Sequence, residues 1–102
     1  MPTINLKKKI NKKIYSSKRL NEIHKSVYNT STWKNLRTQY LVQNPLCEMC
    51  LENKIIKLGV DIHHIIPIST GSTTFEYQNL GFDLQNLMCL CKNCHIEIHR
   101  YL

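Results

Sequence analysis

Four cysteines in two closely spaced pairs are the first residues whose spacing could support chemistry. The pairs are Cys47 with Cys50 and Cys91 with Cys94. Two thiolates separated by two residues can bind one ion from a tight turn, and two such turns complete the tetrahedral four-sulfur shell that structural zinc prefers. We therefore expect one structural Zn²⁺ at these four residues.

Other interpretations of the cysteines remain open at this point. Disulfides fit less well, because five cysteines leave one unpaired and the N-terminus shows no apolar secretory segment. A reducing cytoplasm is the expected location. We expect Cys89 to be a buried apolar thiol, although it could replace Cys91 as a ligand. His95 could likewise replace a cysteine of the second pair.

Four histidines form the second group with chemical potential. His95 and His99 are four residues apart on an expected helix, so their side chains share one face and can converge on one ion. His63 and His64 are neighbours on an expected strand, where side chains alternate between faces. This alternation predicts one metal ligand and one general base, because a neutral imidazole with a pKa near ~6.5 can accept a proton from water. Asp61 should share the face of His63, where we expect a solvated carboxylate rather than an acceptor for a ligand histidine.

Positive charge is concentrated in the first third of the chain. The formal net charge is +7, with ten Lys and Arg against one Glu in residues 1–37 and four against six acidic residues in residues 38–102. We expect residues 1–29 to form a basic arm, flexible or helical when bound, that contacts nucleic acid phosphates. The contacting side chains would be Lys7, Lys8, Lys9, Lys12, Lys13, Lys18 and Arg19. A solubilising tail is the alternative. No run of about 18 apolar residues suggests a membrane span.

Residues 30–102 should form one small α+β domain whose modest core depends on metal binding. A hydroxyl at residues 30–32 can cap a helix over residues 32–43, with Trp33 as a core anchor rather than a base-stacking residue. Residues 55–58 and 60–68 are β-prone and should form a hairpin or ribbon.

The second half of the domain should contain less regular structure before its final helix. Residues 69–83 read as a loop pinned to the core by Phe75, Tyr77, Leu80 and Phe82. Residues 84–90 lead into the second cysteine pair, and a helix should follow over residues 92–101. The expected order is helix, knuckle, ribbon, loop, knuckle, helix.

These motifs together resemble the HNH endonuclease family, in the zinc-knuckle form common among bacteriophages. The matching elements are Cys47-x-x-Cys50, His63-His64-Ile-Ile-Pro67, Asn86-Leu87 and Cys91-x-x-Cys94-His95-x-x-x-His99. The resemblance covers roughly residues 33–100 and implies a ββα-metal (His-Me finger) fold, in which a β-ribbon and a helix hold one divalent ion. Many relatives have Asp-His where this chain has His63-His64, and the His-His version also occurs.

The resemblance also implies roles for individual residues. His63 falls at the metal-ligand position with His95 and His99, the ion being Mg²⁺, Mn²⁺, Ni²⁺ or Zn²⁺. His64 falls at the general-base position and Asn86 at the central asparagine that holds the loop of the base. The implied activity is DNA cleavage in a bacterial host cell, leaving 5′-phosphate and 3′-hydroxyl ends. The alternatives are a non-catalytic zinc-stabilised DNA-binding module and a packaging accessory beside a phage terminase.

Overall fold

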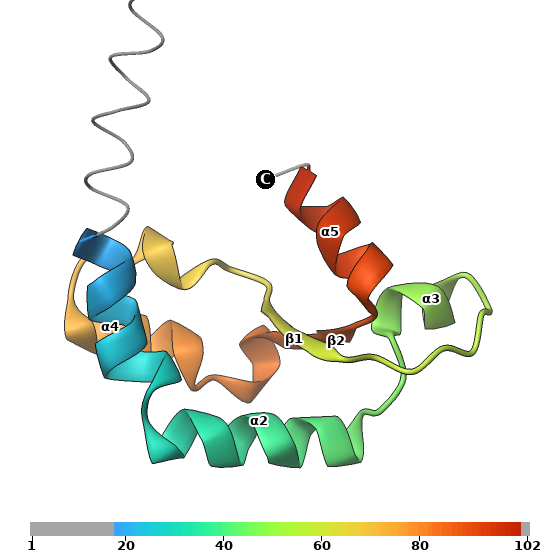
Figure 1. Ribbon diagram of the computed structural model, residues 1–102, viewed down its shortest axis with the longest axis horizontal. Helices are drawn as coiled ribbons and strands as arrows, with labels where there is room; N and C mark the ends of the chain where they lie inside the picture. The colour runs from blue at the N-terminus through green and yellow to red at the C-terminus, as the bar shows by residue number, and fades with distance from the viewer. Residues whose placement is uncertain (1–17, 101–102) are drawn as a thin grey trace, which may run out of the picture.

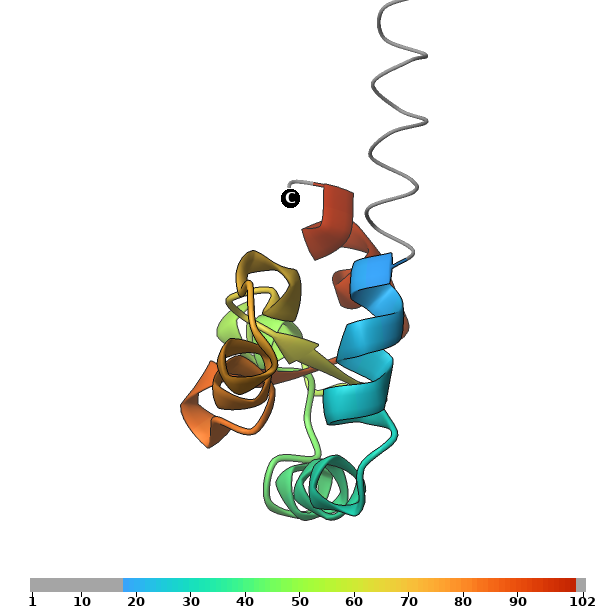
Figure 2. The ribbon, with the colours of Figure 1, turned by 90° about the vertical axis from the view of Figure 1, so that its left-hand side faces the viewer.

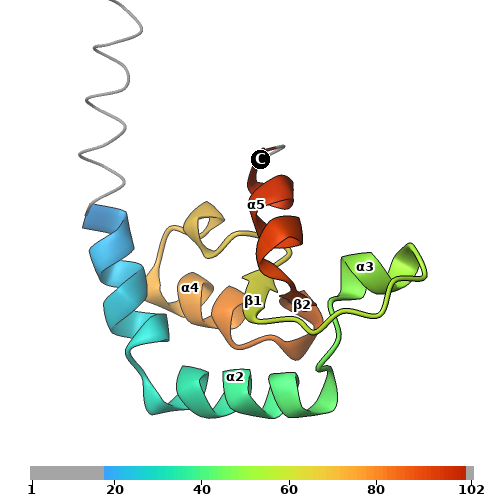
Figure 3. The same ribbon diagram turned by 45° about the vertical axis from the view of Figure 1, so that its right-hand side comes forward.

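A two-stranded antiparallel ribbon lies at the centre of the structure, a computed structural model that describes residues 18–100 (Figure 1). After α-helical residues 18–23, the elements are η1 (His24–Tyr28), α2 (Ser31–Gln43), α3 (Glu48–Glu52), β1 (Asp61–His64), η2 (Ile68–Thr70), α4 (Thr74–Gly81), η3 (Leu84–Asn86), β2 (Leu87–Leu90) and α5 (Lys92–Arg100). Helix α2 lies below the ribbon and α5 rises above it, in an arrangement that Figures 1 and 3 both show.

The first helix, residues 18–28, packs against the core. Its π-helical part η1 contains Val27, which is fully buried, and Ile23 is buried one turn earlier. Figure 2 shows this helix standing over one end of α2. Within the expected arm of residues 1–29, residues 18–28 are helical and reach the core, because Leu20, Ile23 and Val27 supply an apolar face at helical spacing. Residues 1–17 lie outside the described part.

Helix α2 agrees with the expectation from sequence. Thr30 caps its start by accepting the Trp33 N–H at 3.2 Å, and the helix ends where Asn44 precedes Pro45. Trp33 is only 6% exposed and belongs to the core, as predicted. Its hydroxyl cap and its anchor thus fix where the helix begins and how it faces the domain.

The ribbon itself joins different segments from those expected. Strand β1 pairs with β2, with Asp61 opposite Leu90 and His64 opposite Leu87, so the prediction that residues 55–58 pair with residues 60–68 is wrong. Residues 55–60 instead follow the first cysteine pair, where Lys57 O accepts the Cys47 N–H at 2.7 Å. Gly59 allows this path, because a Cβ there would collide with the Cys89 sulfur.

Helix α4 occupies the segment that was expected to be a loop. Thr73 caps it by accepting the Glu76 N–H at 3.2 Å, and the Glu76 carboxylate accepts hydrogen bonds from the Thr73 hydroxyl at 3.2 Å and from the Ser72 N–H at 3.3 Å. This variant of the Thr-x-x-Glu capping box stabilises a helix start in spite of the turn-forming residues before it. Tyr77 is buried, as predicted, whereas Phe75 is 72% exposed and does not pin the segment.

Two apolar clusters lie on either side of the ribbon. The larger contains Ile23, Val27, Trp33, Ile68, Tyr77 and Leu87. The smaller contains Cys47, Cys50, Leu90 and Cys91. Strand β2 contributes Leu87 to the first cluster and Leu90 to the second, so the ribbon connects the two. Within residues 18–100, no helix is long and apolar enough to cross a membrane.

Candidate active site

The two cysteine pairs meet in one cluster. The sulfur atoms of Cys47, Cys50, Cys91 and Cys94 all lie within 4.8 Å of one another. Cys47 caps α3 by accepting the Cys50 N–H at 3.5 Å, and the second pair lies at the start of α5. Four soft sulfur donors at these separations fit the tetrahedral shell of zinc. Cys89 is fully buried and lies outside this cluster.

The surroundings of Cys47 favour its charged form. Burial alone would raise its pKa, but hydrogen bonds with the backbone of Cys91 and Cys50 outweigh burial and lower the pKa to about 6. Burial raises the pKa of Cys94 instead. Since the thiolate is the form that binds metal, one ligand is already charged at neutral pH while Cys94 would release its proton on binding.

Three of the four candidate histidines form a second cluster at the junction of β1 and α5. Ligand nitrogens of His63, His95 and His99 all lie within 4.8 Å of one another. His95 Nε2 and His99 Nε2 are 3.0 Å apart, as expected for residues one turn apart on a helix. Burial, and then the neighbouring His95 and His99, lower the pKa of His63. A neutral imidazole is the form that binds a metal ion, so this donor set fits a divalent cation.

Asp61 forms a hydrogen bond with one histidine of this cluster. Its Oδ2 lies 3.0 Å from His95 Nδ1, so the expectation of a merely solvated carboxylate is wrong. Because the carboxylate accepts the Nδ1 proton, the Nε2 lone pair of His95 is left for an ion. The strand places Asp61 and His63 two residues apart on one face, which was the signal for this contact.

His64 lies apart from the three-histidine cluster. Its Nε2 is 3.2 Å from the carbonyl oxygen of Gly81, and its ring packs on Trp33 with centroids 4.9 Å apart. The side chain is only 7% exposed, and this burial lowers its pKa. The alternation predicted for neighbouring strand residues thus separates His63 from His64.

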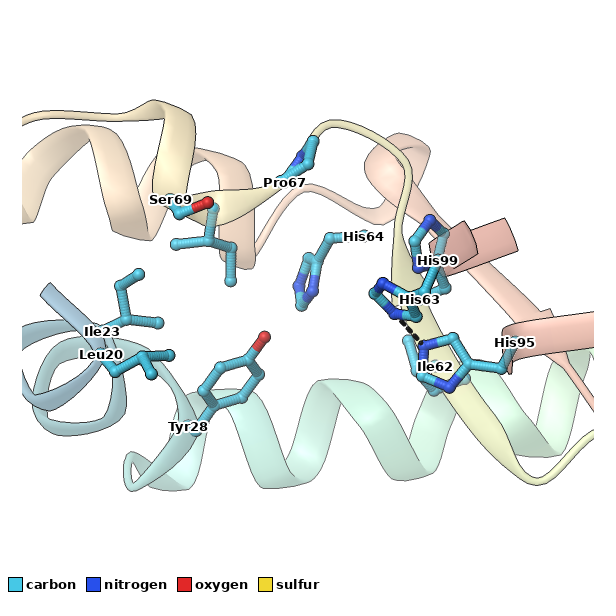
Figure 4. A pocket seen from close by; sticks show the side chains of 11 residues that line it. Leu20, Ile23, Tyr28, Ile62, His63, His64, Pro67, Ser69, His95 and His99 are labelled. Carbon is cyan, nitrogen blue, oxygen red and sulfur yellow. Dashed lines mark hydrogen bonds between the residues drawn. The ribbon is translucent and has the colours of Figure 1, made fainter. Parts of the chain in front are cut away.

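One open cavity of about 540 Å³ brings both groups of histidines together. Its lining consists of Leu20, Ile23, Tyr28, Ile62, His63, His64, Pro67, Ile68, Ser69, His95 and His99. Figure 4 shows His63, His95 and His99 at one end, the first helix with Leu20, Ile23 and Tyr28 at the other, and His64 between them. The wall formed by the first helix was not predicted from the sequence, although the helical spacing of Leu20 and Ile23 could have indicated it.

Asn86 holds the chain that follows His64. Its Oδ1 accepts the Ile66 N–H at 2.7 Å, while its Nδ2 donates to Ile66 O at 3.1 Å and to Leu80 O at 2.9 Å. The side chain is 5% exposed, and its three hydrogen bonds all go to the backbone of these two residues. This arrangement suits a residue that orients a loop.

The predicted phosphate-contacting residues divide into two sets. Lys18 and Arg19 are exposed at the start of the first helix, and Arg19 donates to Ser69 O at 2.7 Å. The others, Lys7, Lys8, Lys9, Lys12 and Lys13, lie outside the described residues. A basic end of the first helix therefore adjoins the cavity wall that Ser69 helps to form.

Comparison with known proteins extends these observations. The HNH endonuclease family profile matches residues 47–100, which contain both clusters and His64. The HNH endonuclease of the deep-sea thermophilic bacteriophage GVE2, whose crystal structure contains a manganese ion, is 28% identical, with a TM-score of 0.70 over 88% of this chain and 91% of that chain. Anaredoxin from Nostoc sp. is 28% identical over 68 residues, which are 67% of this chain and 79% of that protein. The structural similarity shows a shared ββα-metal fold, in which the ribbon and α5 carry the histidines.

Proposed function

The chain belongs to the HNH endonuclease family, and on this premise we propose that it is a metal-dependent endonuclease that hydrolyses phosphodiester bonds in DNA. One observation carries the proposal. A buried histidine outside the metal cluster, His64, lines the same cavity as the three histidines that could hold an ion. A zinc-stabilised binding module would use the cysteines alone and would have no need of this arrangement.

His64 is suited to accept a proton. A carbonyl oxygen can only accept a hydrogen bond, so the contact with Gly81 O requires that Nε2 carries the proton. The unprotonated nitrogen is then Nδ1. Because burial lowers the pKa of His64, the imidazole is neutral near pH 7 and available as a general base.

The hydrolysis can be written from these groups. A water oxygen attacks phosphorus while His64 Nδ1 takes the water proton, the bond from phosphorus to the 3′ oxygen breaks, and solvent protonates the leaving oxygen. The products are a 5′-phosphate and a 3′-hydroxyl. Asn86 contributes by positioning, since its bonds to the Ile66 backbone hold the segment that follows His64.

We propose that His63, His95 and His99 hold the catalytic divalent ion, with Asp61 orienting His95. When bound, such an ion polarises the phosphate and stabilises the leaving oxygen. The manganese of the GVE2 enzyme supports a divalent cation, and Mg²⁺, Mn²⁺, Ni²⁺ and Zn²⁺ are the ions to compare. A structural zinc at the four cysteines is proposed as the second metal.

The basic residues before the domain are proposed to supply affinity for DNA. Lys18 and Arg19 are exposed beside the cavity, and five further lysines precede them in residues 1–17. Contacts between such side chains and phosphates release condensed counterions and do not depend on base sequence. Sequence-independent DNA binding next to the histidines is the expected result.

Cleavage of supercoiled plasmid in the presence of each of the four ions tests the function. The wild-type protein should convert supercoiled DNA to nicked or linear forms. His64→Ala should slow this reaction by about 10²-fold or more, as is usual for loss of a general base. His64→Gln, which keeps an N–H that can reach toward Gly81 O, should be slowed similarly because it cannot accept the water proton.

The matched control is Gln39→Ala, which changes an exposed side chain of α2 that does not line the cavity. It should cleave at the wild-type rate. All variants should keep the wild-type metal content, but His64→Ala should lower the melting temperature because it leaves a cavity beside Trp33, so the His64→Gln variant decides the role of this residue. A wild-type protein that leaves plasmid intact with every ion would overturn the nuclease function, and a His64→Gln variant of full activity would overturn the role of this residue.

A further inference from the structure

The wall of the cavity opposite α5 lies outside the region that the family profile matches. That profile begins at residue 47, whereas this wall is built by the first helix, residues 18–28. Leu20 and Ile23 give it an apolar surface, and Tyr28 is its one polar side chain among those that line the cavity. A polar group on an otherwise apolar wall, facing a cluster of histidines, is a candidate for contact with a bound substrate.

The ring of Tyr28 is held between three aromatic neighbours. Its centroid lies 5.6 Å from that of Trp33 in an edge-to-face arrangement, 6.0 Å from that of His64, and 5.3 Å from that of His24. Contacts of this kind favour one ring orientation. Figure 4 shows the Tyr28 hydroxyl pointing away from the first helix, into the cavity and toward His64.

The backbone that carries Tyr28 is positioned by the same residue that holds His64. Val27, which precedes Tyr28, is fully buried against Gly81, and a Cβ at Gly81 would lie only 2.6 Å from Val27 Cγ1. The carbonyl oxygen of Gly81 in turn contacts His64 Nε2. Gln78 Nε2, one turn earlier in α4, donates to Ser26 O at 3.2 Å. Helix α4 therefore fixes Tyr28 and His64 relative to each other.

The Tyr28 hydroxyl is available as a hydrogen-bond donor. Within residues 18–100 it makes no hydrogen bond to another protein group. Burial raises the pKa of Tyr28 above its usual value, so the hydroxyl is protonated near neutral pH, where His64 is also neutral. A neutral donor is suited to this place, because it can bind a phosphate oxygen without adding positive charge next to the histidines that would hold a cation.

We propose that Tyr28 is a further catalytic residue, whose hydroxyl donates a hydrogen bond to a non-bridging oxygen of the scissile phosphate. The role rests on the proposed nuclease function. A phosphate attacked by the water that His64 deprotonates must lie in the cavity that Tyr28 lines. A fixed donor aimed at an oxygen that gains charge during the reaction stabilises the transition state more than the ground state.

The test is single-turnover cleavage of a short duplex whose scissile position has first been mapped with the wild-type protein. Tyr28→Phe removes the hydroxyl and keeps the ring. It should slow cleavage by about tenfold or more, the amount expected when one such donor is lost. Tyr77→Phe, at a buried tyrosine that does not line the cavity, is the matched control and should cleave at the wild-type rate.

Sulfur substitution at the scissile phosphate identifies the atom that Tyr28 contacts. Two duplexes carry one phosphorothioate at the mapped position, as the Rp or the Sp diastereomer. Sulfur accepts hydrogen bonds poorly, so the Phe substitution should have little further effect on one diastereomer and its full effect on the other. Metal content and melting temperature should equal those of the wild type, which separates loss of the contact from loss of structure.

Three results would overturn this role. Full activity of Tyr28→Phe on the all-oxygen duplex would show that only the ring matters. Equal slowing on both diastereomers would show that the hydroxyl does not contact a non-bridging oxygen. A wild-type protein that cleaves no duplex with any of the four ions would remove the proposed function and this role together, and is distinguished from the other two results by the wild-type reaction alone.

Discussion

At the scale of single residues, Asn86 illustrates how one side chain can satisfy several buried backbone groups. Its amide bonds to both the N–H and the carbonyl of Ile66 and to the carbonyl of Leu80. Those two residues belong to the segment after β1 and to α4, which lie far apart from each other along the chain. Asn86 therefore connects the end of β1 to the helix whose Gly81 carbonyl contacts His64.

Replacing Asn86 by Ala should lower the free energy of unfolding by about 2–4 kcal/mol, because three backbone groups lose their partner at a buried site. Urea denaturation of the metal-loaded protein measures this change. Gln85→Ala is the control, since Gln85 is exposed and adjacent, and should shift stability by less than about 0.5 kcal/mol. Equal midpoints for the two variants would show that the Asn86 bonds do not stabilise the domain.

Sequence spacing predicted which residues with metal-binding side chains lie together, but not which residues meet them through tertiary contacts. Cysteines three positions apart, and histidines four positions apart on a helix, are brought together by local structure, and both predicted clusters form as sets. The contact of Asp61 with His95 depends on how α5 crosses the ribbon, and that of Tyr28 with His64 depends on a helix packed from outside the motif. Neither crossing can be derived from local periodicity.

At the scale of elements, α2 and α5 were predictable because each has a local signal. A hydroxyl cap and a regular apolar spacing define α2, and the cysteine pair followed by paired histidines defines α5. Helix α4 had a signal too, the Thr73 and Glu76 capping box, but the Gly and Ser residues before it favoured a loop. The partner of β1 could not be derived, since β2 lies more than 20 residues further along the chain and either β-prone segment could have paired with residues 61–64.

The basic region has two parts. Residues 1–17 lie outside the described residues, whereas residues 18–28 form the first helix and contribute Ile23 and Val27 to the core. Deleting residues 1–17 should keep the fold while weakening DNA binding and flattening its salt dependence, because fewer counterions are released. Deleting residues 1–29 should also remove Ile23 and Val27 from the core and lower stability by several kcal/mol. Affinity at several salt concentrations, with thermal unfolding of both truncated proteins, measures the two effects.

A charge-only control separates loss of charge from loss of chain in this experiment. Changing Lys7, Lys8, Lys9, Lys12 and Lys13 to Gln keeps the length and should reproduce the weaker salt dependence of the shorter deletion. An unchanged salt slope in both proteins would show that these lysines do not contact phosphate. Equal stability of the two deletions would show that the first helix does not support the core.

At the scale of the whole molecule, the proposed zinc site connects the parts of a domain with little core of its own. The four cysteines join the region before β1 to the start of α5, and three of them, Cys47, Cys50 and Cys91, are themselves members of the smaller apolar cluster. In a domain of this size, metal binding supplies a large share of the folding free energy. His95 directly follows Cys94, so its position in the histidine cluster depends on how the cysteine cluster holds the start of α5.

Metal analysis of the purified protein should therefore find one tightly bound zinc per chain, in addition to any ion at the histidines. Cys47→Ser should lose that zinc and unfold, because a hydroxyl is a poor replacement for a thiolate ligand. Cys89→Ala is the matched control, since Cys89 is buried outside the cluster, and should retain the zinc and the fold. A folded Cys47→Ser variant without zinc would contradict the structural role of the metal.

Residues 87–94 have a consequence for the folding kinetics of the domain, because two of its long-range connections end there. Residues 87–90 pair with β1, and Cys91 and Cys94 then meet the first cysteine pair. Bringing together residues that are far apart in sequence is the slow step in the folding of small domains. Bringing the two cysteine pairs together costs less chain entropy once the ribbon has formed. The rate of folding should thus be set by the ribbon. We expect the proposed structural metal to bind after that barrier, and it should therefore act mainly by slowing the rate at which the native protein unfolds.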